Sequence, residues 1–186
     1  MTNNKNLLPP SPWVIRFMPL ITDGGAVLDL ACGRGRHAVF LADAGYNVTA
    51  VDRDLSSLPA QDRINPVEAD LEDGSPWPLA GRDFDGIVVT NYLHRPLFPA
   101  LIDSLRLGGV LIYETFAVGN EAFGRPTNPD FLLRDGELLA SVAGKLSVVA
   151  YEAGKVDLPK TAVIQRIAAV KSPDGPVPLN RQVAGE

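Results

Sequence analysis

The stretch from Ala26 to Asp52 (AVLDLACGRGRHAVFLADAGYNVTAVD) constrains the fold more than any other part of the chain. A short apolar run ends abruptly in the turn CGRG at residues 32–35, and an amphipathic segment follows the turn. A second apolar run, residues 48–51, then closes on Asp52. This order of strand, glycine turn, helix, strand and acidic residue is typical of one half of a nucleotide-binding α/β unit.

The spacing within this stretch predicts a bound nucleoside. Gly33 and Gly35 let the backbone approach a ligand closely, and the start of the next helix offers N–H groups that have no partner within the helix. Asp52 lies 19 residues after Gly33, at a strand end where a carboxylate can accept hydrogen bonds from a ribose. The spacing does not say which nucleoside binds.

The rest of the chain continues the alternation of strands and helices over short loops, which predicts a parallel, doubly wound sheet. Further strands are expected at residues 66–69, 84–90 and 110–115, and helices at residues 97–105 and 131–143, with a polar helix or turn at 55–64. Gly108-Gly109 is expected to cap the helix that ends at Leu105. The runs 146–151 and 161–170 leave no room for a helix between them, so we expect an antiparallel pair at the sheet edge.

Length and composition indicate one domain and exclude several classes of partner. We expect the domain to cover residues 13–171, with a mobile arm at 1–12 and a loose Pro-rich tail at 172–186. Within the arm, Ser11 and Pro12 are suited to start a short helix. The net charge of −5, with no Lys/Arg run, predicts no nucleic-acid partner. No apolar run approaches ~18 residues and no signal peptide is visible, so we expect a cytoplasmic protein without a membrane partner. One cysteine and two histidines predict no disulfide and no metal site.

Two kinds of nucleotide fit the glycine turn. The pattern Gly33-x-Gly35-x-x-Ala38 also matches the dinucleotide fingerprint, so a nicotinamide or flavin enzyme is an alternative. Against it, Asp29 at the end of the first strand would face the place of a pyrophosphate, and like charges repel. A cationic ligand such as a sulfonium amino acid would be favoured there. Asp70, at the end of the third strand, is also well placed to accept a hydrogen bond from an adenine amino group.

Four segments resemble the successive motifs of class I S-adenosylmethionine-dependent methyltransferases, including small bacterial members of the tellurite-resistance type. They are VLDLACGRGR at 27–36, VTAVDRD at 48–54, Asp70-Leu71 and LGGVLI at 107–112. The resemblance implies a three-layer, doubly wound, Rossmann-like α/β fold of seven strands, ordered 3-2-1-4-5-7-6, with strand 7 antiparallel. It also implies S-adenosylmethionine as cofactor and S-adenosylhomocysteine as product. Ala31 stands where the family usually has glycine, and alanine should be tolerated there if the local φ is negative.

The resemblance further implies roles for individual residues. Asp29 would hold the methionine amino group, Asp52 the ribose hydroxyls and Asp70 the adenine amino group. The full set of cofactor-binding residues that it implies is Asp29, Ala31, Gly33, Gly35, Asp52, Arg53, Asp70, Leu71 and Asn91.

Methyl transfer requires an enzyme to position the acceptor and exclude water, and some acceptors also need a proton removed. Tyr92 and His94 follow the fourth strand and are the candidate catalytic residues, although His94 could instead cap or contact a neighbouring loop. Arg125, in the irregular segment 117–129, is expected to contact a carboxylate or oxyanion of the acceptor, unless it only holds its own loop.

The sequence therefore predicts an S-adenosylmethionine-dependent methyltransferase acting on an unidentified small-molecule acceptor. Two alternatives stay open: a nicotinamide-dependent Rossmann oxidoreductase, and a non-catalytic module that binds S-adenosylmethionine.

Overall fold

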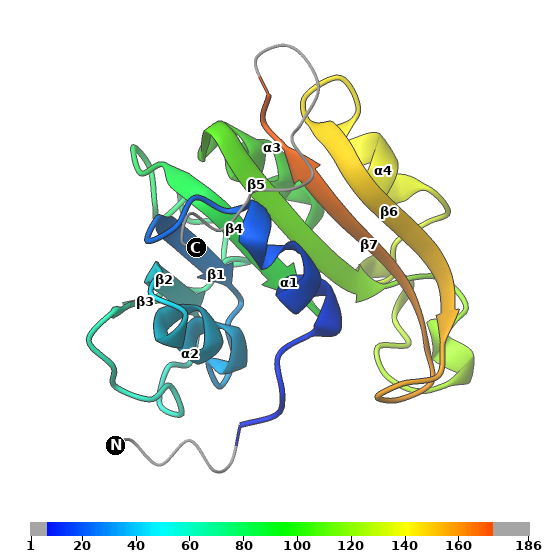
Figure 1. Ribbon diagram of the computed structural model, residues 1–186. Helices are drawn as coiled ribbons and strands as arrows, with labels where there is room; N and C mark the ends of the chain where they lie inside the picture. The colour runs from blue at the N-terminus through cyan, green and yellow to red at the C-terminus, as the bar shows by residue number, and fades with distance from the viewer. Residues whose placement is uncertain (1–6, 173–186) are drawn as a thin grey trace, which may run out of the picture.

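The computed structural model describes residues 7–172, and these residues form a seven-stranded sheet between two layers of helices (Figure 1). The order of the strands across the sheet is β3-β2-β1-β4-β5-β7-β6, as predicted. The strands are β1 (Ala26–Leu30), β2 (Asn47–Asp52), β3 (Ile64–Glu68), β4 (Phe84–Thr90), β5 (Leu105–Phe116), β6 (Ser147–Val156) and β7 (Ala162–Val170). The predicted tail beyond Ser172 and residues 1–6 of the predicted arm lie outside the described residues.

The first five strands run parallel, and β7 is antiparallel to both of its neighbours, β5 and β6. In register, Leu30 of β1 lies beside Val51 of β2 and Val89 of β4, and Asp52 lies beside Glu68 of β3. The carboxyl ends of β1 to β4 therefore meet at one edge of the sheet. In open α/β sheets this edge is where ligands bind.

The helices cover both faces of the sheet (Figure 1). On one face lie α1 (Pro12–Phe17), the 3-10 turn η1 (Met18–Leu20) and α2 (Arg36–Asp43); on the other lie η2 (Arg95–Leu97), α3 (Phe98–Asp103) and α4 (Glu137–Val142). Each face has its own apolar core, one built with Trp13 and Leu41, the other with Leu101 and Leu138. No helix in residues 7–172 is long and apolar enough to cross a bilayer.

The start of α1 is part of the folded domain rather than of a mobile arm. Ser11 is the N-cap, and its side chain accepts a hydrogen bond of 3.1 Å from the Trp13 backbone N–H, while Pro12 occupies the first helical position. Ser11 is also buried. The helix start predicted at Ser11 and Pro12 is therefore confirmed.

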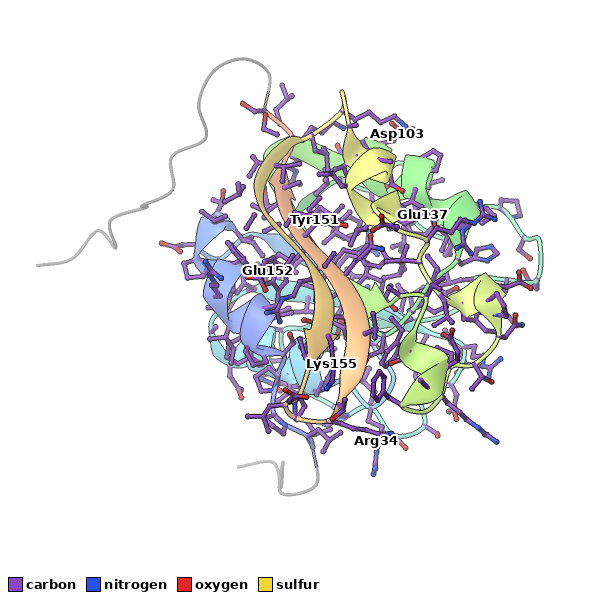
Figure 2. The ribbon with its side chains drawn as sticks, turned by 90° about the vertical axis from the view of Figure 1, so that its right-hand side faces the viewer. Arg34, Asp103, Glu137, Tyr151, Glu152 and Lys155 are labelled. Atoms are coloured by element: carbon purple, nitrogen blue, oxygen red, sulfur yellow. The ribbon has the colours of Figure 1, made fainter. Side chains whose placement is uncertain are left out.

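The last two strands form the predicted antiparallel pair, with β6 at the sheet edge. Successive side chains alternate between the two faces, as Figure 2 shows for Tyr151 and Glu152. Glu152 pairs with Arg16 of α1, whereas the Tyr151 hydroxyl donates to Gln165, whose Oε1 also accepts from the first turn of α4. The edge strand is thus tied to the helices on both faces.

Two sequence-based expectations about helices are wrong in detail, and a third is decided between its alternatives. Gly108-Gly109 does not cap a helix but lies inside β5, where Gly108 has φ +80° and the pairing of β4 with β5 shifts register. The segment expected at 55–64 as a polar helix or turn contains turns and no helix up to the start of β3, since Pro59 disfavours a helical conformation in the residue before it. Within 131–143 only Glu137–Val142 is helical, because Gly136 precedes it with φ +64°.

Candidate functional site

A cleft of about 390 Å³ opens at the carboxyl edge of the sheet. Its walls come from the ends of β1 and β2, the loop after β3, the loop after β4 and the short 3-10 turn η4 (Pro129–Phe131). We call it the carboxyl-edge cleft, and it is lined by Ala31, Asp52, Arg53, Ala69, Asp70, Leu71, Glu72, Tyr92 and Phe131.

Asp52 links the end of β2 to the glycine turn. Its Oδ2 accepts a hydrogen bond of 2.8 Å from the Gly33 backbone N–H, and its Oδ1 accepts one of 3.2 Å from the Asp54 backbone N–H. A carboxylate offers about four lone-pair positions, so these two bonds leave acceptor capacity that can face the cleft. Asp52 is half-buried and oriented by the backbone, which suits a residue that binds a diol.

Ala31 is in the left-handed region, with φ +52°, so the condition of a negative φ is not met. This conformation favours glycine, because a Cβ then crowds the following carbonyl oxygen. Gly33 has φ +53°, and an added Cβ there would meet nothing within 4 Å. A Cβ on Gly35 would collide with the side chain of Leu58. The turn therefore leaves open space at Gly33, whereas a side chain at Gly35, which has φ +82°, would displace the end of the Leu58 side chain.

Asp29 is a buried carboxyl group with an unused acceptor. Only 1% of the residue is exposed, and its Oδ2 has no hydrogen-bond partner among the described residues. Burial raises the pKa of Asp29 to about 7, against the opposing effects of the Ala38 backbone N–H and the Arg36 guanidinium. A buried polar atom without a partner is costly, so an ammonium group would suit this position. The residue thus fits the methionine end of the predicted cofactor, although it is not among the residues that line the cleft.

The loop after β3 supplies both acidic and apolar surface to the cleft. Asp70 closes a turn, since its Oδ1 accepts a hydrogen bond of 2.9 Å from the Glu72 backbone N–H. Asp70 and Arg53 are exposed and Leu71 is half-buried, and all three line the cleft. Three carboxylates and one guanidinium therefore surround the space, which favours a cationic ligand.

Tyr92 is half-buried, and its hydroxyl has no hydrogen-bond partner among the described residues. Burial, followed by the effect of the Glu72 carboxylate, raises the pKa of Tyr92 above its usual range. The phenol is therefore protonated near neutral pH and can donate a hydrogen bond, but it is a poor general base. The backbone carbonyl of Tyr92 accepts a hydrogen bond of 2.8 Å from the buried Tyr113 hydroxyl, which holds this loop against β5.

The remaining predicted residues lie outside the cleft lining as the structure describes it. His94 is half-buried just before η2, Arg125 is exposed, and Asn91 is exposed with φ +57°. Sequence reasoning missed three lining residues: Ala69, Glu72 and Phe131. The first two flank the predicted pair Asp70-Leu71 and could have been included on that ground. Nothing in the sequence pattern singles out Phe131.

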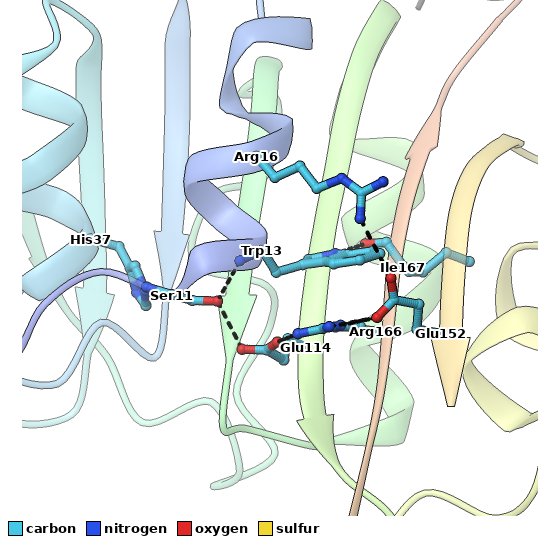
Figure 3. Close-up of polar contacts among 8 residues, drawn as sticks. All are labelled: Ser11, Trp13, Arg16, His37, Glu114, Glu152, Arg166 and Ile167. Atoms are coloured by element: carbon cyan, nitrogen blue, oxygen red, sulfur yellow. Dashed lines mark hydrogen bonds and ion pairs between the residues drawn. The ribbon is translucent and has the colours of Figure 1, made fainter. Parts of the chain in front are cut away.

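A polar network joins the N-terminal segment to the sheet beside this edge (Figure 3). His37 Nε2 accepts a hydrogen bond of 3.1 Å from the Ser11 backbone N–H, and its Nδ1 lies 3.4 Å from Thr90 Oγ1. Ser11 Oγ donates to Glu114, which pairs with Arg166 at 3.2 Å. Burial, with the Arg36 charge, lowers the pKa of His37 to about 3. A neutral His37 therefore connects the first helix to the end of β4.

Comparison with known proteins agrees with the fold. Residues 27–108 match the profile of a family described as a methyltransferase domain. The structure is similar to that of TehB from Haemophilus influenzae, with a TM-score of 0.73 and 19% identity over 90% of this chain and 64% of that one. It is also similar to the glycopeptide N-methyltransferase MtfA complexed with S-adenosylhomocysteine, with a TM-score of 0.60 and 18% identity over 86% of this chain and 88% of that one.

Among curated proteins, the chain is 31% identical to the protein-L-isoaspartate O-methyltransferase of Chlorobaculum tepidum over 120 residues, which cover 59% of this chain and 55% of that protein. The chain spans about half the length of the curated relatives it matches. The profile match thus covers less than half of the chain, and the solved structures share its fold.

Proposed function

We propose that the protein is an S-adenosylmethionine-dependent methyltransferase and that the carboxyl-edge cleft binds its cofactor. The observation that carries the proposal is the position of Asp52, which the glycine turn orients by a 2.8 Å hydrogen bond into a cleft also lined by Asp70 and Leu71. The unpartnered Oδ2 of Asp29 and the open space at Gly33 further support it.

When bound, S-adenosylmethionine supplies a methyl group on an activated sulfonium carbon. Asp52 binds the ribose hydroxyls, Asp70 with Leu71 and Arg53 holds the adenine, and Asp29 receives the ammonium group. Ala31, Gly33, Gly35 and Asn91 complete the proposed cofactor-binding set. The acidic lining also balances the positive charge of the cofactor.

The protein's contribution to the transfer is to position the acceptor and exclude water. Tyr92 donates a hydrogen bond from its protonated phenol, since its raised pKa disfavours the phenolate. His94 is the proposed general base where an acceptor needs one, and Arg125 is the proposed contact for an anionic acceptor.

We propose a small molecule as the acceptor. The net charge of −5 disfavours general attraction to nucleic acid. Three further points stay predictions from the sequence: a cytoplasmic location, the absence of nucleic-acid and membrane partners, and a single domain over residues 13–171.

Parallel calorimetric titrations with S-adenosylmethionine, S-adenosylhomocysteine and NAD test the proposal. Micromolar binding of the first two, without binding of NAD, is the expected result. Binding of NAD alone would instead indicate a nicotinamide-dependent oxidoreductase. Cofactor binding without turnover in a broad acceptor screen would indicate a non-catalytic binding module.

A further inference from the structure

Phe131 is a large apolar side chain in an unusual position, because it is 41% exposed and still lines the carboxyl-edge cleft. It belongs to η4, the one-turn segment whose N-cap is Asn128, with a 3.0 Å hydrogen bond from the Asp130 backbone N–H to the Asn128 side chain. When a ligand covers an aromatic ring and removes it from water, the free energy of the complex is lowered. Phe131 is thus suited to contact whatever fills the cleft.

The backbone on both sides of Phe131 is held by a single side chain, Arg95. The Arg95 Nη1 donates to the Asp130 carbonyl at 2.6 Å, and its Nη2 donates to the Leu132 carbonyl at 2.8 Å. These two carbonyls belong to the residues immediately before and after Phe131. A planar guanidinium fixes the direction of its donors, so the pair of bonds determines where this segment lies.

Arg95 is itself oriented by Glu137, in the first turn of α4. Its Nε and Nη2 donate to the two Glu137 carboxylate oxygens at 2.6 Å and 2.9 Å, which is the bidentate arrangement. Figure 2 shows Glu137 between α4 and the green segment around α3. The carboxylate also accepts a 2.8 Å hydrogen bond from the Arg134 backbone N–H. The guanidinium therefore has little freedom to change its geometry.

Arg95 also lies three residues after Tyr92, on the loop that forms another wall of the cleft. One guanidinium thus couples two walls that come from distant parts of the chain, the loop after β4 and the segment before α4. We propose that Phe131 contacts the bound cofactor and that Arg95 is the positioning residue that holds Phe131 in place. This inference rests on the proposed function, because it assigns the cleft to the cofactor.

A double-mutant cycle on S-adenosylhomocysteine affinity tests the inference with the full chain. Phe131→Ala and Arg95→Lys are made singly and together, and Kd is measured by calorimetry alongside Tm. Lysine keeps the charge but loses the fork geometry. If Arg95 acts through Phe131, Arg95→Lys weakens binding about tenfold when Phe131 is present and less than about twofold when Ala is at position 131. The Tm loss caused by Arg95→Lys is expected to be similar in both backgrounds.

Arg106→Lys is the matched control, because Arg106 pairs with Asp85 at 2.7 Å near the opposite edge of the sheet. It is expected to leave Kd unchanged. If Arg95→Lys does not fold, Glu137→Gln replaces it in the same cycle. An equal loss of affinity in both backgrounds, or no loss in either, would overturn the positioning role while leaving the proposed function intact. Failure of the wild type to bind S-adenosylhomocysteine or S-adenosylmethionine would overturn both.

Discussion

The Asp52 carboxylate, at the end of β2, accepts a 2.8 Å hydrogen bond from the Gly33 backbone N–H in the turn that follows β1. The acid proposed to bind the ribose therefore also orders the glycine turn against which the cofactor would lie. Its second oxygen accepts from the Asp54 backbone N–H. The proposed ligand binding and the local backbone conformation therefore involve the same side chain.

Replacing Asp52 should therefore impair cofactor binding severely. We expect Asp52→Ala to weaken S-adenosylhomocysteine binding about 100-fold, since hydrogen bonds to a charged group are each worth roughly 1.5–3 kcal/mol. Asp52→Asn keeps one oxygen acceptor and should lose less. Asp54→Ala is the control, because Asp54 is exposed and accepts only a local 2.9 Å hydrogen bond from Ser56. Calorimetry checks all three variants, and unchanged affinity in Asp52→Ala would refute the ribose assignment.

Replacing Ala31 with glycine should stabilise the fold. At φ +52° an L-residue is strained by roughly 1–2 kcal/mol, and the extra backbone entropy of glycine returns part of this. We expect Ala31→Gly to stabilise the fold by about 0.5–1 kcal/mol and raise Tm by about 2 °C. Ala42→Gly, inside α2, is the same substitution at a helical position and should destabilise by about 1 kcal/mol. A lower Tm for Ala31→Gly would show that the methyl group is needed for packing.

Asp29 should make folding less favourable as pH rises. Its folded pKa of about 7 lies above the ordinary 3.8, so the folded state binds more protons than the unfolded state between these values. Stability from this group is therefore lost as pH rises from about 4 to 7. Thermal melts of the unliganded protein check this. The Tm of Asp29→Asn minus the Tm of wild type should be higher at pH 8 than at pH 5. An equal difference in Tm between Asp29→Asn and wild type at the two pH values would contradict the raised pKa of Asp29.

His37 should have the opposite pH dependence. Its folded pKa of about 3 lies below the ordinary 6.5, so the unfolded state binds the proton in this range. Stability from this group is present above about pH 6.5 and is lost as pH falls towards 3. Glutamine can still accept the hydrogen bond from the Ser11 backbone N–H. His37→Gln should be less stable than wild type at pH 7.5, and this difference in stability should be smaller at pH 5. Denaturation midpoints at the two pH values check this, and a constant gap would contradict it.

The sheet could be predicted from the sequence because each strand carries its own signal. The apolar runs at β1, β2 and β4 are buried on both faces, and the missing helix between β6 and β7 predicts their antiparallel pairing. Glycine was harder to interpret. Gly108 looks like a helix cap from local pattern, but its positive φ serves an irregularity inside β5 that depends on pairing with β4.

The candidate site was predictable only where residues follow strand ends. Asp52, Asp70 and Tyr92 were identified in this way and line the cleft. Phe131 was missed because it is brought there by long-range contacts from Arg95, 36 residues earlier in the chain. The positive φ of Ala31 could not be predicted from the sequence, because an alanine normally avoids the left-handed region.

The most direct test of the central claim is a crystal structure of the protein with S-adenosylhomocysteine. We predict ribose hydroxyls within hydrogen-bond distance of Asp52 and the adenine between Arg53 and Leu71. Density for the ligand elsewhere, for example in the second cleft beside Leu58 and Ile64, would contradict the assignment of the carboxyl-edge cleft to the cofactor.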